Sequence, residues 1–204
     1  MDLVLFGKSL LLGLAIAAPI GPIGTLCINR TLDKGFVAGV AGGLGTALAD
    51  ALYAALAAIG FAAFSGLLMI IDTPLRLIGG AFMLWLGFKS LNATPAPGVA
   101  KVSARDLLGT TAATFTLTIV NPMTILSFTA LFAGLGLATS ATGMRALLVV
   151  AGVFTGSMLW WVILSGGISI VRHRLPVSFA VWISRLSGIL LLGFGAWALV
   201  TALT

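Results

Sequence analysis

Six long apolar stretches occupy most of this chain, and they constrain its fold more than any other feature. Each is close to the roughly 20 residues that a helix needs to cross a hydrocarbon core about 30 Å thick. They lie at about residues 4–28, 36–60, 75–91, 107–137, 146–170 and 185–204. Because only 8% of the residues are charged, against about 25% in a soluble domain, we expect an all-α integral membrane protein. Residues 1–204 should form a single transmembrane domain.

The basic residues are distributed unevenly among the predicted loops. Eight of the 11 Lys and Arg lie in or beside the first, third and fifth loops, namely Arg30, Lys34, Lys89, Lys101, Arg105, Arg172, Arg174 and Arg185. Loops rich in Lys and Arg stay in the cytoplasm. We therefore expect these loops to be cytoplasmic and both termini to lie outside. The net charge of +6 reflects this topology, and no soluble basic face is available for nucleic acid.

Short matches between the two halves suggest a duplicated three-helix unit. Arg76–Gly79 (RLIG) matches Arg185–Gly188 (RLSG), and Ala41–Gly42 matches Ala151–Gly152, which sets Asp50 opposite Trp160. Three is an odd number, so the second copy would be inverted in the membrane, as in many transporters. The repeats would cover about residues 1–91 and 107–204. Chance matches in a sequence rich in Gly, Ala and Leu are the alternative.

Each half also carries prolines deep inside its first apolar stretch. Pro19-Ile20-Gly21-Pro22 and Asn121-Pro122 should break the first and fourth helices, because proline lacks an N–H and clashes with the preceding turn. Irregular backbone inside a bilayer is tolerated only where it faces protein or a wet cavity, and paired breaks mark transporter substrate sites. Thr110, Thr114 and Thr118 run at helical spacing into the second break. They could instead simply bond to carbonyls of their own helix.

Asp50 is the only acid inside a predicted span. It lies about 22 Å along the helix from Lys34 at 1.5 Å per residue, which puts it near the midplane, where an ionised carboxylate is costly. It could carry a proton in antiport, pair with a substrate ammonium, or be a protonated structural acid. We expect a substrate cavity at this level, lined by Thr46, Tyr53, Thr114, Thr118 and Trp160.

Rows of small residues mark the second stretch. Gly35, Gly39, Gly43, Ala47, Ala51 and Ala55 recur every fourth residue. Such rows let helices approach closely. We expect them to pack helices within the chain, and they could also mediate a homodimer.

Several of these motifs together resemble the LysE-type (lysine exporter) amino-acid exporter superfamily. The similar segments are Pro19-x-Gly21-Pro22, the glycine-rich stretch from Gly35 to Asp50, Leu77-x-Gly79-Gly80 with Leu84-Trp85-x-Gly87, and Asn121-Pro122. The resemblance covers the whole chain. It implies export of amino acids or related metabolites across the bacterial inner membrane, driven by the proton gradient and without a cofactor. It marks Pro19, Gly21, Pro22, Asp50, Asn121 and Pro122 as substrate or coupling residues. The chain differs from many members in Met123, where a basic residue often follows Asn-Pro, and in a short third loop.

Other functions are less compatible with the residues. Intramembrane aspartyl hydrolysis needs two acids and only Asp50 is available, while His173 lies in a basic loop and cannot serve a buried serine. We therefore expect no enzymatic activity. An exporter of divalent metal ions would need a cluster of ligands, and only Asp50 and Cys27 are near. That exporter and a membrane scaffold without transport activity remain the alternatives.

Overall fold

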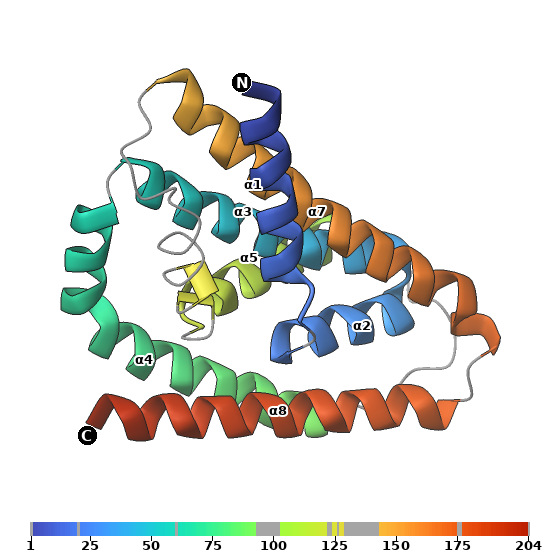
Figure 1. Cartoon of the computed structure of the whole chain (residues 1–204). Helices are drawn as coiled ribbons and strands as arrows, with labels where there is room; N and C mark the ends of the chain where they lie inside the picture. The colour runs from blue at the N-terminus through green and yellow to red at the C-terminus, as the bar shows by residue number, and fades with distance from the viewer. Residues whose placement is uncertain are drawn as a thin grey trace.

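The chain is helical throughout its described part, with no strand among those residues. The computed structural model describes residues 2–19, 21–59, 61–92, 103–121, 124–125, 127–128, 143–174 and 177–203. The helices are α1 (Asp2–Ala17), α2 (Pro22–Lys34), α3 (Phe36–Ile59), α4 (Phe61–Leu91), α5 (Ala104–Ile119), α7 (Met144–Val171), the 3₁₀ turn η1 (Arg172–Arg174) and α8 (Val177–Leu203). Figure 1 shows α8 lying along the second half of α4, and α1 lying against α7.

Among the described residues, three helices, α3, α7 and α8, are long and apolar enough to cross a membrane. The pair α1 and α2 also passes as one bent span, with an angle of 82° between its halves. The protein is therefore a multi-pass membrane protein. Much of the predicted fourth stretch, 107–137, lies outside the described residues, and its first part forms α5.

Three predicted boundaries were wrong, and one is the start of the sixth stretch, since α8 begins at Val177 and not near 185. The third stretch was expected at 75–91, but α4 begins at Phe61 and carries Pro74 inside it. Proline often kinks a helix without ending it, and Figure 1 shows α4 bent along its length. The first stretch was expected to end near Ile28, but α2 continues to Lys34. Gly35 follows the last turn of α2 with a φ angle of +87°, which residues with a Cβ atom rarely adopt.

The break in the first span lies where the prolines predict it. Helix α1 ends at Ala17 and α2 begins at Pro22, with Gly21 as its N-cap in an extended conformation. Proline is favourable at the first helical position, because its missing N–H would have no partner there. The Thr25 hydroxyl donates a hydrogen bond to the Pro22 carbonyl (2.9 Å) and closes the first turn of α2.

Glycines bring the helices into backbone contact and show their directions. A methyl group at Gly45 of α3 would lie 2.1 Å from the Thr111 carbonyl oxygen of α5, and one at Gly156 of α7 would lie 2.0 Å from the Leu10 carbonyl oxygen of α1. The glycine contacts make α5 parallel to α3 and α1 parallel to α7. Because α3 and α7 cross antiparallel, with Gly39 beside Ser165 and Asp50 beside Ser157, α1 and α5 run in opposite directions.

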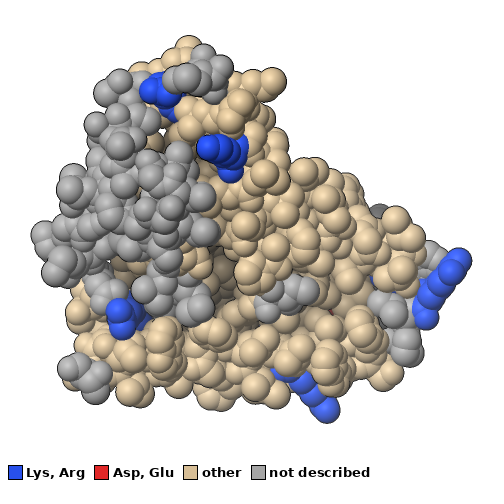
Figure 2. Space-filling model, in the orientation of Figure 1, with Lys and Arg blue, Asp and Glu red and all other residues tan. Residues whose placement is uncertain are grey.

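The outer surface is apolar. Large hydrophobic side chains are exposed on several helices, among them Leu11 of α1, Leu147 and Ile170 of α7, and Trp182 of α8. Figure 2 shows a face with only a few Lys and Arg side chains and no acid. Apolar patches this extensive are typical of surfaces that contact lipid.

Contacts between helix ends place the first, third and fifth loops on one side of the molecule. The Lys34 ammonium forms an ion pair with the Asp106 carboxylate at 3.1 Å, which joins the end of α2 to the start of α5. Beside it, the Arg172 guanidinium lies 3.0 Å from the position that a Cβ on Gly35 would occupy. These loops are the ones that the charge distribution predicts to be cytoplasmic.

Candidate functional site

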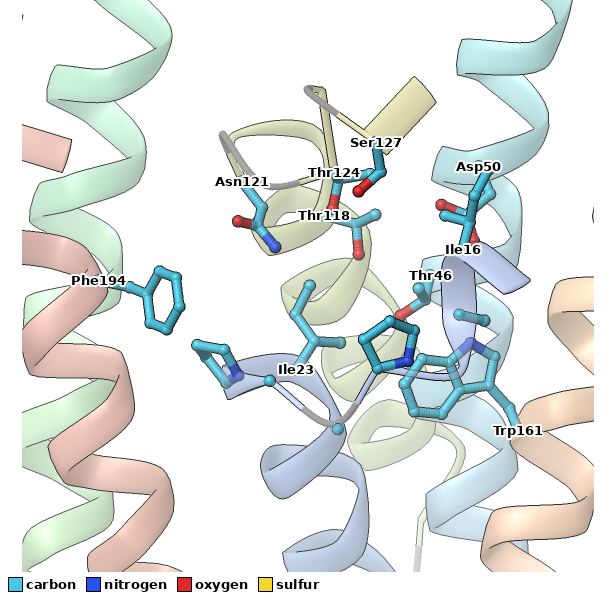
Figure 3. Close-up of a pocket in the computed structure, with 15 residues that line it drawn as sticks. Ile16, Ile23, Thr46, Asp50, Thr118, Asn121, Thr124, Ser127, Trp161 and Phe194 are labelled. Carbon is cyan, nitrogen blue, oxygen red and sulfur yellow. The ribbon is translucent and has the colours of Figure 1, made fainter. Parts of the chain in front are cut away.

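A pocket of about 290 Å³ opens at the break between α1 and α2. The end of α1, the start of α2, the middle of α3, the end of α5, α7 and α8 all contribute to it. Its lining residues are Ile16, Ala17, Pro19, Gly21, Pro22, Ile23, Gly24, Thr46, Asp50, Thr118, Asn121, Thr124, Ser127, Trp161 and Phe194. Figure 3 shows Thr46 and Asp50 on one side, Thr118 and Asn121 facing them, and Phe194 farther across.

Asp50 supplies the acid in this pocket. Its side chain is 1% exposed, and its Oδ2 accepts a hydrogen bond of 2.7 Å from the Ser157 hydroxyl of α7. Its Oδ1 has no hydrogen-bond partner among the described residues. A buried carboxylate oxygen without a partner is costly. A proton or a cationic group of a ligand in the pocket would offset that cost.

Two threonine hydroxyl groups of the pocket donate their protons within their own helices. Thr46 donates to the Gly42 carbonyl (3.4 Å) and Thr118 to the Thr114 carbonyl (2.8 Å), each one turn back along its own helix. Such bonds are the structural alternative foreseen for the threonines. They leave the oxygen lone pairs of Thr46 and Thr118 free to accept from a donor in the pocket.

The structure brings most of the predicted site residues together at this pocket. Pro19, Gly21, Pro22, Thr46, Asp50, Thr118 and Asn121 line it, whereas Pro122 lies outside the described residues. Their roles in transport stay predictions.

Three residues predicted to line the cavity do not. Tyr53 is buried and donates its hydroxyl to the Ile119 carbonyl, and Thr114 donates to the Gly42 carbonyl of α3 (2.7 Å), a bond between helices. Trp160 is half-buried and packs against the core. Its neighbour Trp161 lines the pocket instead, because consecutive residues of a helix point about 100° apart.

Sequence reasoning missed Ser157, which contacts Asp50, and Phe194, which lines the pocket. Ser157 could have been noticed as a polar residue in an apolar stretch. Its partner could not have been identified, because 107 residues separate the two in sequence.

Potential metal ligands do not gather around Asp50. Within the described ranges, no group of three or more His, Cys, Asp or Glu side chains could hold an ion. Cys27 is buried and packs beside Gly42, where an added Cβ would lie 2.9 Å from its sulfur.

Comparisons with known proteins place this architecture in a family. The LysE type translocator family matches residues 14–202. The chain is 31% identical to the uncharacterized membrane protein YahN of Escherichia coli, over 72% of this chain and 67% of YahN. It is 26% identical to the putative amino acid efflux protein YcgF of Bacillus subtilis (94% and 93%) and 29% identical to the chemotactic transduction protein ChpE of Pseudomonas aeruginosa (97% and 98%). No solved structure matches it. The chain belongs to the LysE type translocator family of membrane transporters.

Proposed function

We propose that this protein exports amino acids or related small metabolites from the cytoplasm of a bacterium across its inner membrane. In this proposal Asp50 couples export to proton entry. The observation that carries it is the buried Asp50 carboxyl group in a pocket at a helix break, with one oxygen held by Ser157 and the other without a hydrogen-bond partner among the described residues. The name of the relative YcgF, a putative amino acid efflux protein, supports amino acids as the substrate class.

The pocket suggests how coupling would work. When the pocket is empty, a proton on Asp50 offsets the cost of burying its charge. When a substrate ammonium enters from the cytoplasm, it can pair with the ionised carboxylate, and the proton leaves. A single titratable group that binds either a proton or substrate, but not both, gives antiport.

Inverted repeats would supply the alternating access that this mechanism needs, and two observations support them. The first is the opposite direction of α1 and α5 described above. The second is a reciprocal contact between α4 and α8. A Cβ on Gly80 would meet the Gly195 carbonyl oxygen (2.9 Å) and one on Gly87 the Gly188 carbonyl oxygen (3.0 Å).

A two-fold axis would exchange these two contacts. This axis would make Gly80 equivalent to Gly188. The sequence match between the halves instead aligns Gly79 with Gly188, so the two alignments differ by one residue. Repeat-related helices can shift by a residue in this way when packing at the shared seam decides their register.

The test is a growth assay. A strain that lacks the protein is loaded with dipeptides, so that internal hydrolysis raises single amino acids, and is compared with the complemented strain. The proposal expects sensitivity to at least one dipeptide and relief by the wild-type gene. Relief of sensitivity to a divalent metal salt instead would favour the metal exporter. A complemented strain with neither effect would favour the scaffold.

A further inference from the structure

A second, smaller pocket lies along the same helix α2, toward the end that carries the first loop. Its volume is about 100 Å³. It is lined by Leu26, Asn29, Arg30, Asp33, Leu86, Lys89, Ser90 and Ser184. On α2 the lining of the Asp50 pocket ends at Gly24 and the lining of the second pocket begins at Leu26, so the two pockets are adjacent along the helix axis. The second pocket therefore lies between the Asp50 pocket and the predicted cytoplasmic face.

The lining follows the faces of two helices. Leu26, Asn29, Arg30 and Asp33 are spaced i, i+3, i+4 and i+7 on α2, and Leu86, Lys89 and Ser90 are spaced i, i+3 and i+4 on α4. Residues at these spacings share one helix face. The two helices thus present three charged side chains and two uncharged polar ones to the same small space.

A polar network forms the base of this pocket and joins three helices. Ser184 of α8 donates its hydroxyl proton to the Asn29 Oδ1 of α2 (3.2 Å), and Ser90 of α4 donates to the Ser184 carbonyl (2.9 Å). Asn29 and Ser184 are buried. The network ties α2, α4 and α8 together at the pocket.

Asp33 feels the charges of Arg30 and Lys34 nearby, but it makes no direct contact with the cations of the pocket among the described residues. No ion pair or hydrogen bond joins Asp33 to Arg30 or Lys89 in the part of the chain that the structure describes. The neighbouring Lys34 is engaged with Asp106. The Lys89 ammonium lies over the Trp85 ring, 5.2 Å from its centroid. Two cations and one carboxylate in a half-buried space match a ligand with an anionic and a cationic end.

We propose that this pocket captures the zwitterionic head of an α-amino acid on the cytoplasmic side before it reaches the Asp50 pocket. Arg30 and Lys89 bind the carboxylate and Asp33 binds the ammonium. Arginine suits the first role, because its planar fork matches a carboxylate. This inference rests on the proposed function and adds a second site to it.

The test uses inside-out membrane vesicles, whose cytoplasmic face meets the medium. The probe is the ¹⁴C-labelled amino acid that the dipeptide assay shows to be exported. Arg30→Gln and Asp33→Asn should each raise the half-saturating concentration about three- to tenfold, as expected for a lost charge-assisted hydrogen bond at a partly wet site. The maximal rate should stay within about twofold of wild type, since the Asp50 pocket is intact. Lys89→Gln, an exposed position, gives a second test of the carboxylate subsite.

Arg105→Gln is the matched control. Arg105 is exposed and lies next to Asp106 on the same side of the molecule, but outside the pocket. Like Arg30→Gln, the Arg105→Gln variant removes one positive charge from this face. It therefore controls for changes in surface charge and in membrane orientation. In right-side-out vesicles the substrate arrives from the other side, and Arg30→Gln and Asp33→Asn should behave as wild type.

Competitors assign the two subsites. The amide of the same amino acid lacks the carboxylate, so Arg30→Gln should weaken competition by the amino acid and leave competition by the amide unchanged. The acid that lacks the amino group should be insensitive to Asp33→Asn. If Arg30→Gln and Asp33→Asn match Arg105→Gln, or act equally from both faces, the capture site is refuted while the export function stands. If wild-type protein moves no amino acid, the export function fails, and this inference fails with it.

Discussion

The hydrogen bond from Ser157 to Asp50 holds the Asp50 carboxyl group in one orientation. It joins α7 to α3 inside the core and leaves Asp50 Oδ1 directed to no protein group among the described residues. A hydrogen bond to a charged group contributes about 1.5–3 kcal/mol. Loss of this bond would raise the cost of the ionised state of Asp50, which the proposed exchange of a proton for substrate requires.

We therefore expect Ser157→Ala to lower the export rate about tenfold, equivalent to about 1.4 kcal/mol, and Ser157→Thr to restore most of it because the hydroxyl is kept. Initial rates in inside-out vesicles check this. Ser165→Ala is the control, because Ser165 is equally buried on α7 but its hydroxyl has no hydrogen-bond partner in the described part of the chain. Equal effects of Ser157→Ala and Ser165→Ala would contradict a specific role for Ser157.

Asp50 and the residues of the first break could be predicted because their residue types are unusual inside an apolar stretch. A charged residue inside a membrane span is costly, and prolines break a helix, so both stand out in the sequence as candidate functional positions. The partner of Asp50 and the choice between Trp160 and Trp161 could not be predicted. Both depend on how α7 is rotated against α3, and that rotation is set by small contacts such as Gly43 against the Trp161 side chain.

At the scale of helices, close glycine contacts hold α3 against α5. The Cβ of Gly45→Ala would lie 2.1 Å from a backbone oxygen of α5, so the two helices must separate. We expect a loss of about 1–3 kcal/mol of stability, as for other overpacked cores, measured by thermal unfolding in detergent. Gly109→Ala on α5 is the control. Nothing lies within 4 Å of its added Cβ, and a gain of about 0.5–1 kcal/mol is expected from better helix propensity. A Gly45→Ala variant as stable as Gly109→Ala would show that the helices are not in close contact.

The start of α5 is fixed by the Asp106 carboxylate. Asp106 forms a capping box with Ser103 and an ion pair with Lys34. Hydrogen bonds from the Ser103 side chain, then from Lys34, lower the pKa of Asp106 from 3.8 to about 2. Because the folded-state pKa is the lower one, its contribution to stability is complete above about pH 4 and is lost as the pH falls through about 2.

Thermal unfolding of wild type and Asp106→Asn across pH 2–6 checks this prediction. The difference in melting temperature should be constant from pH 6 to about pH 4 and should shrink toward zero near pH 2. A difference that is unchanged at pH 2 would mean that the carboxylate does not make these bonds in solution.

The lengths of the apolar stretches predicted where the helices lie, but they predicted the helix ends correctly only for some of the spans. The stretches at 36–60 and 146–170 agree with α3 and α7 to within two residues at each end, because a bilayer fixes the length of a straight span. The predicted start of the third stretch was wrong because the helix continues through Pro74. An interior proline can kink a helix or end it, and only packing decides which. Helix α8 begins at Val177, eight residues before the predicted 185, because residues 177–184 (VSFAVWIS) are themselves largely apolar and the helix runs through Arg185 without a break.

On the scale of the whole molecule, the loops rich in Lys and Arg meet at one face, as the ion pair between Lys34 and Asp106 shows. We predict that this face is cytoplasmic. Single cysteines at positions 105 and 145, in a Cys27→Ser background, check the orientation with an impermeant thiol reagent on intact cells. Position 145 should be labelled and position 105 should react only after the membrane is opened. The reverse pattern would invert the topology.

The central claim is that Asp50 exchanges a proton for substrate, and Asp50→Asn tests it most directly. The variant keeps the size of the side chain and can still bond to Ser157, but it stays neutral. Inside-out vesicles receive an imposed pH gradient, and net uptake of the exported amino acid is measured beside substrate exchange without a gradient. We predict that Asp50→Asn reaches the membrane at wild-type level and loses uptake driven by the gradient. Wild-type uptake by Asp50→Asn under the same gradient would contradict the account and leave Asp50 as a structural residue.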